Sequence, residues 1–431
     1  MKGLKLSLII LTATLLIGMS GMAYAFHSGG VAECEGCHSM HSPKASGSFL
    51  LVGIDQSSTC LTCHQNAADT GPSSYHISTI DSRLTAGLAP LQRTPGGDFG
   101  WLKKTYTYSY TSGGVTTTET EEGAIHGHNI VAGDFGYLAD SRNTTAPGGS
   151  FPSGQLACNS CHDPHGQYRR LQSGTIAKTG APIKASGSYN GAAGANEPTA
   201  TEAVGVYRLL AGSGYTKGGV TFNGVPAAKV PSTYNQTEAT NQVRVAYGVA
   251  TAGGHSTWGN WCGTCHTGMH STGNYVHPVD QGLGSTIAGL YNTYVKSGDM
   301  TGAKATAFTS LVPFATNSGD YTALAGLASN SGATASLAGP ETSDQVNCMS
   351  CHRAHASGFL HSLRFDQGYE FMTKGGQYIG SDNPLVGTSG RGPLQSRGRL
   401  SAEWQAAYYD RPATVFATYQ RVLCNKCHAK D

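Results

Sequence analysis

The chain has 431 residues, of which 13% are charged and 59 are glycine, and its 28 Lys and Arg residues nearly balance its 26 Asp and Glu residues. A near-neutral chain lacks the basic surface that nucleic-acid binding requires, so we expect no nucleic-acid partner. A composition so rich in glycine and other small residues is also poor at making a conventional packed core.

Residues 1–25 have the pattern of a secretory signal peptide. Two lysines precede an apolar run at 6–17, and residues 23–25, Ala-Tyr-Ala, form a small-residue cleavage site. A retained membrane anchor is the alternative, but the apolar run is shorter than the about 20 residues that a spanning helix needs. We therefore predict an exported protein, and no later segment is apolar enough to cross a membrane.

The pentapeptide Cys-x-x-Cys-His occurs six times and uses all 12 cysteines of the chain. In chain order (motifs 1 to 6), the cysteines are Cys34, Cys37, Cys60, Cys63, Cys158, Cys161, Cys262, Cys265, Cys348, Cys351, Cys424 and Cys427. The histidines that close the motifs are His38, His64, His162, His266, His352 and His428.

This pentapeptide is the attachment signal of a c-type haem. Two thiols separated by two residues can bond to both vinyl groups of one porphyrin, and the next His reaches the iron from the same side. Zinc ribbons also use Cys pairs, but they do not explain a His after every second Cys. A disulfide framework needs no His at all. We therefore predict six covalently bound haem c groups.

Few regular elements are expected between the motifs. Alternating Tyr and Thr residues predict a β-hairpin that turns at Gly113–Gly114. Residues 166–254 contain no Cys or His, and we expect them to form a surface wrap. Apolar residues three and four apart predict helices around 286–297, 302–311 and 402–409.

The predicted fold is that of a multihaem cytochrome c. Each motif is expected on a short helical turn, and the rest of the chain is expected to be mostly coil, with few strands. Haems supply the large apolar surface that the composition lacks, so we expect residues 26–431 to form a single domain wrapped around a chain of six haems.

Eleven histidines lie outside the motifs: His27, His41, His76, His126, His128, His165, His255, His270, His277, His355 and His361. They suffice to give every iron a sixth ligand, whereas the five methionines of residues 26–431 do not. Bis-histidine ligation lowers the reduction potential relative to His/Met ligation and leaves no open position on the iron. The chain is therefore expected to transfer electrons rather than act as an enzyme.

Some of these histidines lie very close to a motif. His41, His165 and His355 follow a motif histidine by three residues, and His270 follows one by four. On a helical turn such a side chain lies on the same side as the motif histidine, whereas the sixth ligand must come from the opposite face. We therefore expect them to ligate a different haem. The alternative for each is a propionate-bonded or solvent-exposed histidine.

The motifs and their surroundings resemble one known family. The shared segments are FHSGGVAECEGCH, TGPSSYHIS, TPGGDFGW, GHNIVAGD, CHDPHGQYRR, TIAGLYN, CHRAHASGF and LCNKCHAKD. Over essentially the whole of residues 26–431, the sequence is similar to the hexahaem outer-surface c-type cytochromes of metal-reducing Geobacter-type bacteria. This resemblance implies filaments of stacked haems, in which a histidine from the first motif ligates the fifth haem of a neighbouring subunit.

Transferred to this chain, the linking residue is His41 and the fifth haem is the one attached at Cys348 and Cys351. The resemblance implies sixth ligands drawn from His27, His41, His76, His128, His165, His277 and His355, with His270 as a further candidate. His126, His255 and His361 are interpreted as non-ligands.

The resulting hypothesis is an exported cytochrome on the outer surface of the cell that carries electrons along bis-histidine haems, as a homopolymer. Its expected partners are extracellular acceptors, such as metal oxides or other cells, and upstream outer-membrane cytochromes. Two alternatives remain: a monomeric periplasmic or outer-surface carrier, in which His41 ligates a haem of its own chain, and a multihaem reductase with an open iron.

Overall fold

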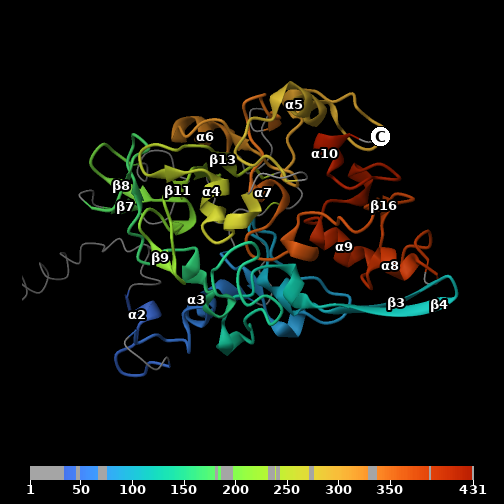
Figure 1. Ribbon diagram of the computed structural model, residues 1–431, viewed down its shortest axis with the longest axis horizontal. Coiled ribbons are helices and arrows are strands. Elements are labelled where there is room, and N and C mark those ends of the chain that lie inside the picture. Colours follow the sequence, from blue (N-terminus) through green and yellow to red (C-terminus); the bar gives the residue numbers. More distant parts are fainter. Residues whose placement is uncertain are drawn as a thin grey trace, which may run out of the picture.

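The structure is a computed structural model that describes residues 34–44, 49–66, 75–179, 183–185, 198–231, 238, 243–270, 276–328, 337–387 and 390–429. Short helices and strands are scattered along an otherwise irregular chain (Figure 1). The predicted signal peptide and His27 lie outside the described residues, as does the side chain of His270.

The α-helices are short. They are α2 (Cys34–Cys37), α3 (Gln56–His64), α4 (Trp258–Gly263), α5 (Gly284–Thr293), α6 (Tyr321–Leu327), α7 (Cys348–Cys351), α8 (Gly392–Ser396), α9 (Ser401–Ala407) and α10 (Asn425–His428). Single 3-10 turns lie between them, including η6 (Cys158–Ser160) and η9 (Lys304–Thr306). Among the described residues, every helix is too short or too polar to span a lipid bilayer.

The strands form small separate sheets. Two-stranded sheets pair β1 (Gln65–Asn66) with β2 (Ser78–Thr79), β3 (Tyr106–Ser112) with β4 (Val115–Glu121), β9 (Thr216–Lys217) with β10 (Val220–Thr221), β11 (Val225–Pro226) with β14 (His255–Ser256), and β16 (Thr373–Lys374) with β17 (Gln377–Tyr378). A three-stranded sheet has the order β12 (Ala228–Lys229), β13 (Ala246–Gly248), β15 (Ala315–Thr316). A four-stranded sheet has the order β6 (Ile176–Ala177), β5 (Arg169–Arg170), β8 (Ala203–Gly205), β7 (Ile183–Ala185).

Every Cys-x-x-Cys-His motif overlaps a short helical turn, as predicted. The longest of these, α3, shows why such a turn forms. The Asp55 carboxylate caps it by accepting a hydrogen bond from the backbone N–H of Ser58 at 2.7 Å. Leu61 is fully buried between the two cysteines of motif 2 and anchors the helix to the protein. The thiol of Cys63 is therefore exposed, whereas that of Cys60 is half-buried.

The predicted hairpin is confirmed as β3 and β4, which project from the body of the molecule (Figure 1). Helices are also confirmed near two of the three predicted positions, as α5 and α9. The prediction for 302–311 is wrong, because only the turn η9 forms there. The backbone N–H of Phe308 donates to the carbonyl of Leu337 instead of to a carbonyl one turn earlier, so the chain leaves the helical path.

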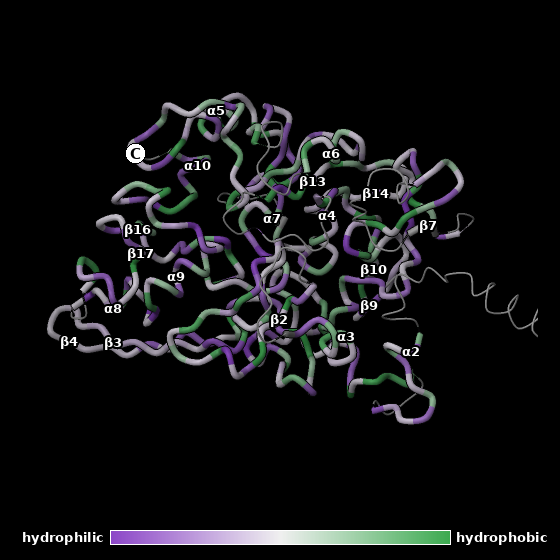
Figure 2. Tube along the Cα trace, turned by 180° about the vertical axis from the view of Figure 1, so that it is seen from behind, coloured by the Kyte–Doolittle hydropathy of each residue, from purple (hydrophilic) through white to green (hydrophobic). Residues whose placement is uncertain are grey.

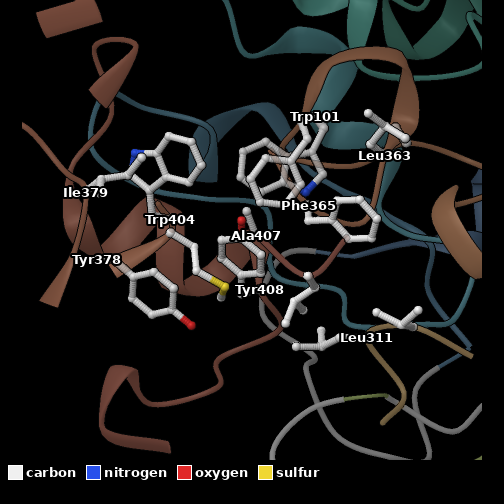
Figure 3. Close-up of a cluster of buried hydrophobic side chains, with 14 of the residues drawn as sticks. Trp101, Leu311, Leu363, Phe365, Tyr378, Ile379, Trp404, Ala407 and Tyr408 are labelled. Carbon is white, nitrogen blue, oxygen red and sulfur yellow. The ribbon is translucent and has the colours of Figure 1, made fainter. Parts of the chain in front are cut away.

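A protein core exists despite the composition. In the larger cluster, aromatic side chains from distant segments pack together, among them Trp101, Phe365, Tyr378, Trp404 and Tyr408 (Figure 3). Figure 2 shows that hydrophobic segments are short and interspersed with polar ones along the whole trace, rather than gathered into one layer. The core is therefore assembled from isolated large residues that the many small ones separate.

The expectation that 166–254 forms a surface wrap is wrong for its described part. Val225, Ala228 and Tyr247 are at most 1% exposed and belong to a second hydrophobic cluster. Strand β12 pairs with β13, and β11 pairs with β14, so the buried side chains of these strands join one cluster. The Gly- and Ala-rich composition hid these core residues from a composition-based prediction.

Candidate haem-binding sites

The six motifs follow one another in space in the same order as in the sequence. The haem-attachment site at each motif takes the number of that motif, from site 1 to site 6. The thiol of Cys60 in motif 2 donates a hydrogen bond to the sulfur of Cys158 in motif 3. The thiol of Cys262 in motif 4 donates likewise to Cys348 in motif 5. Motifs 2 and 3, and motifs 4 and 5, therefore meet at their first cysteines.

The other three pairs of neighbouring motifs are linked through a second cysteine, beginning with Cys37 of motif 1, whose pKa is raised by burial and by the nearby Cys63 of motif 2. Burial raises the pKa of Cys161 to about 12, and the nearby thiol of Cys265 in motif 4 adds to this rise. Burial likewise raises the pKa of Cys351 to about 12, with a further contribution from Cys424 in motif 6. The turns that carry the motifs run from α2 at one end of the molecule to α10 toward the other (Figure 1). The attachment sites thus form one continuous series.

The motif histidines are oriented by backbone carbonyls. The Nδ1–H group donates to a carbonyl oxygen in five of the six motifs: His38 to Phe49 at 2.7 Å, His64 to Tyr75 at 2.7 Å, His162 to Arg208 at 2.6 Å, His266 to Pro147 at 2.9 Å and His352 to His361 at 2.9 Å. A carbonyl only accepts, so Nδ1 carries the proton and Nε2 carries the lone pair. The hydrogen bond from Nδ1–H to the carbonyl therefore fixes the tautomer in which Nε2 can bind a metal.

Four motif histidines face a second imidazole. The ring centroids are 6.3 Å apart for His38 and His165, 6.4 Å for His162 and His355, 6.0 Å for His266 and His128, and 6.1 Å for His428 and His277. Two metal–nitrogen bonds of about 2 Å, plus about 1 Å from each nitrogen to its ring centre, give a separation of about 6 Å. Each pair therefore leaves room for one iron between its rings.

The pKa is lowered for three of these histidines, which favours their neutral form. Burial lowers the pKa of His128 to about 4 and that of His355 to about 3. Burial also lowers the pKa of His162. At neutral pH these imidazoles are uncharged, which is the form that binds a metal.

Site 5 differs from these four. Among the residues that the structure describes, no second imidazole pairs with the ring of His352, and His41 is exposed without a ring partner. At site 2, His64 contacts the edge of the Tyr75 ring, with centroids 5.9 Å apart, and the buried His76 contacts the same tyrosine.

Two histidines interpreted as non-ligands use both ring nitrogens in other contacts. The His126 ring contacts the Trp101 carbonyl at 3.0 Å and Glu121 Oε1 at 2.8 Å. The His255 ring contacts the carbonyls of Val225 and Gly174, at 3.2 and 2.8 Å. Neither ring has a nitrogen left for an iron. His361 is exposed, and its carbonyl oxygen orients His352.

The sequence did not reveal the buried charges behind site 5. Arg364 Nε donates to the carbonyls of Met349 and His352, at 2.7 and 3.2 Å, and so holds the attachment turn α7. Arg364 and Arg353 both pair with Glu238, at 2.8 and 2.9 Å, and all three side chains are at most 2% exposed. Arg353 lies inside the motif segment CHRAH, which is the one sequence signal that could have pointed to this cluster.

The donor set fits covalent haem. Thiols stand in adjacent pairs beside histidines whose Nε2 is free of protons, and opposing rings stand at the separation that one iron requires. When bound, the haem supplies an iron that gains and loses a single electron. The chain would hold it through the paired thiols and the Nε2 atoms of the facing histidines, which the backbone carbonyls orient.

No protein-family model matches the chain. The chain is 52% identical, over an alignment of 454 positions that spans all of both proteins, to the C-type cytochrome OmcS of Geobacter sulfurreducens. Two solved structures have a TM-score of 0.81 to it: the Outer Membrane Cytochrome S filament, 50% identical over 95% of this chain, and the OmcS nanowires, 51% identical over 94% of it, both from G. sulfurreducens and both covered over their full length. This full-length similarity, together with the attachment motifs, establishes that the chain belongs to the OmcS family of c-type cytochromes.

Proposed function

We propose that the protein carries electrons along six covalently bound haems and assembles into an extracellular filament. Its proposed ligand pairs are His38 with His165, His162 with His355, His266 with His128, and His428 with His277. For site 2 the sixth ligand is proposed to be one of His27, His76 and His270. The protein is proposed to be exported with residues 1–25 removed, and to act as an electron carrier rather than an enzyme.

The filament proposal is supported by a spacing that two of these histidine pairs share. His165 follows motif 3 and faces the histidine of motif 1. His355 follows motif 5 and faces the histidine of motif 3. In both pairs, the histidine three residues after a motif faces the motif two places earlier in the chain.

The same rule requires a seventh motif to complete site 5. The chain has only six motifs, but motif 1 of a second copy carries His41 at the required offset. His41 is exposed, and the His352 ring has no second imidazole among the described residues. Motif 1 of a second copy thus takes the place of a seventh motif in the series. The resulting contact between copies is head-to-tail and can repeat without closing into a ring.

The relatives support this assembly. OmcS has been solved as a filament and described as nanowires.

For this chain, we propose the outer surface of the cell as the location, upstream outer-membrane cytochromes as donors, and metal oxides or partner cells as acceptors. Bis-histidine ligation along the whole series leaves no open iron for a substrate, so each site passes electrons on.

The test is electron microscopy of the secreted, haem-loaded protein beside its His41→Ala variant. Ser42→Ala is a matched control, because it alters the neighbouring exposed side chain and removes no imidazole. Filaments from the native protein and from Ser42→Ala, with dispersed particles from His41→Ala, are expected. Dispersed particles in all three samples would overturn the filament, and filaments in all three would overturn the choice of His41.

A further inference from the structure

Three chain segments cross beside sites 3 and 4; we call residues 96–97, 126–128 and 354–357 the histidine crossing. Gly127 forms an antiparallel bridge with Ala356, and Gly97 forms a parallel bridge with the same residue. The crossing therefore joins segments that are far apart in the sequence. It also carries two proposed sixth ligands, His128 for site 4 and His355 for site 3.

The two ligands are bonded directly to each other's segment. The backbone N–H of His128 donates to the carbonyl of His355 at 2.9 Å, and its ring Nδ1 donates to the carbonyl of Ala354 at 2.7 Å. In return, the backbone N–H of Ser357 donates to the carbonyl of His126 at 3.0 Å. Displacing the backbone of either histidine therefore pulls on the backbone that holds the other one.

The third segment orients the ring of His355. The backbone N–H of His355 donates to the Gly96 carbonyl at 2.7 Å, and its Nδ1 lies 3.4 Å from the Gly97 carbonyl oxygen. The ring also stacks on Phe99, with centroids 4.6 Å apart and planes inclined by 23°. These contacts act on His355 and do not reach the His128 ring.

Glycine permits this close approach. A Cβ atom on Gly127 would overlap the carbonyl oxygen of His355 and would lie 2.7 Å from the Cβ of Ala356. A Cβ atom on Gly96 would instead lie 2.9 Å from Nδ1 of His355, at the movable end of a side chain. The φ angle of Gly127 is 172°, which any residue adopts, so space rather than backbone conformation selects glycine there.

The far side of the crossing is anchored by the buried His126 ring. Its contacts with the Trp101 carbonyl and with Glu121 hold the segment 126–128 in place against residues 354–357. Arg399 also donates to the carbonyl of Gly358 at 2.9 Å and pairs with Glu121, so both segments share one anchor. Strain introduced between them therefore acts on the two ligands rather than on a flexible loop.

We propose that Gly127 is a positioning residue that joins His128 and His355 into one unit, so that the sixth ligands of sites 3 and 4 are set together. This inference rests on the ligand pairs of the proposed function. A side chain at position 127 would push the two segments apart and draw both imidazoles away from the irons they would hold. Consecutive sites in the middle of the series then respond as a pair to one substitution.

The test measures the number of high-spin ferric haems in filaments of the purified, haem-loaded full chain by electron paramagnetic resonance, with haem content determined separately. His128→Ala and His355→Ala are each expected to turn one of the six sites high-spin. Gly127→Ala is expected to alter two sites together, with full haem content, whereas Gly96→Ala is expected to alter site 3 alone. Gly289→Ala, on α5 with no atom within 4 Å of the added Cβ, is the matched control and is expected to alter none.

The outcomes separate this inference from the proposed function. If either histidine variant leaves all sites low-spin, the ligand pairs are wrong. If both behave as expected but Gly127→Ala alters one site or none, the coupling is overturned. Should Gly127→Ala load fewer than six haems, His126→Asn provides the same test, because it loosens the anchor without placing an atom between the segments; paired changes at sites 3 and 4 are expected, and a change at one site or at neither overturns the coupling.

Discussion

Sites 3 and 5 are built from the same kind of motif but are completed differently. At site 3, a second ring, His355, stands 6.4 Å from His162. At site 5, the described residues place no second ring opposite His352, yet buried Arg364 bonds to the carbonyl of His352 itself. In the proposed pairing, the chain therefore completes site 3 by itself, whereas at site 5 it supplies the motif histidine and a buried arginine that holds the attachment turn. A half-site that is already ordered favours binding of the ligand proposed to come from a second copy, because little ordering remains to be done.

The largest expected effect is the loss of an iron ligand, and it distinguishes the two sites directly. His355→Ala is expected to leave site 3 high-spin in filaments and in dispersed subunits alike. Dispersing native filaments is expected to turn only site 5 high-spin, because its ligand leaves with the neighbouring subunit. Electron paramagnetic resonance before and after dispersal checks both statements, and a fully low-spin dispersed subunit would contradict the assignment of His41.

Removing the buried carboxylate behind site 5 is the next largest change. Glu238→Ala leaves Arg353 and Arg364 buried without a partner charge, which costs about 3–5 kcal/mol of folding free energy. Urea unfolding followed by haem absorbance measures this cost. Glu341→Ala removes an ion pair whose two side chains are 64% and 45% exposed, and it is expected to change the unfolding free energy little.

The anchor next to sites 3 and 4 makes a smaller, pH-dependent contribution. Burial alone would raise the pKa of Glu121, but hydrogen bonds and charges from His126 and Arg399 hold it well below its usual range. A carboxylate with a lowered pKa stabilises the fold above its unfolded value of 4.5 and loses this contribution as the pH falls. Glu121→Gln is therefore expected to cost about 1.5–3 kcal/mol at pH 7.

The difference between native and Glu121→Gln protein is expected to shrink as the pH falls below 4.5. Urea unfolding of the two proteins at several pH values gives this difference. A gap that stays constant down to pH 3 would show that Glu121 is not held ionised.

The smallest effect is expected from the ring that supports His355. Phe99 is 3% exposed and stacks on the imidazole at 4.6 Å. Phe99→Leu keeps most of the buried apolar volume but removes the stacking, which is worth about 0.5–1.5 kcal/mol. A small loss of stability together with a shifted signal from site 3 alone is expected. An equal shift at site 5 would mean that Phe99 acts on the fold in general.

The chemistry of the protein could be predicted from the sequence because it depends on residues close together in the chain. The Cys-x-x-Cys-His spacing is local, and so are the turns that carry it, the hairpin at Gly113–Gly114 and the helices α5 and α9. The full-length resemblance extended this reading to the family. The prediction for 302–311 failed because an apolar spacing cannot reveal that the Phe308 N–H has a partner near residue 337.

The pairing of ring with ring was decided by the tertiary structure. Which histidine faces which motif depends on crossings between segments more than 100 residues apart, and no local pattern records them. The same holds for the valines and tyrosines buried within 166–254, and for Glu238, whose two arginines come from a distant part of the chain. Sequence spacing states which residues can bind a haem; only packing brings two of them to opposite sides of one iron.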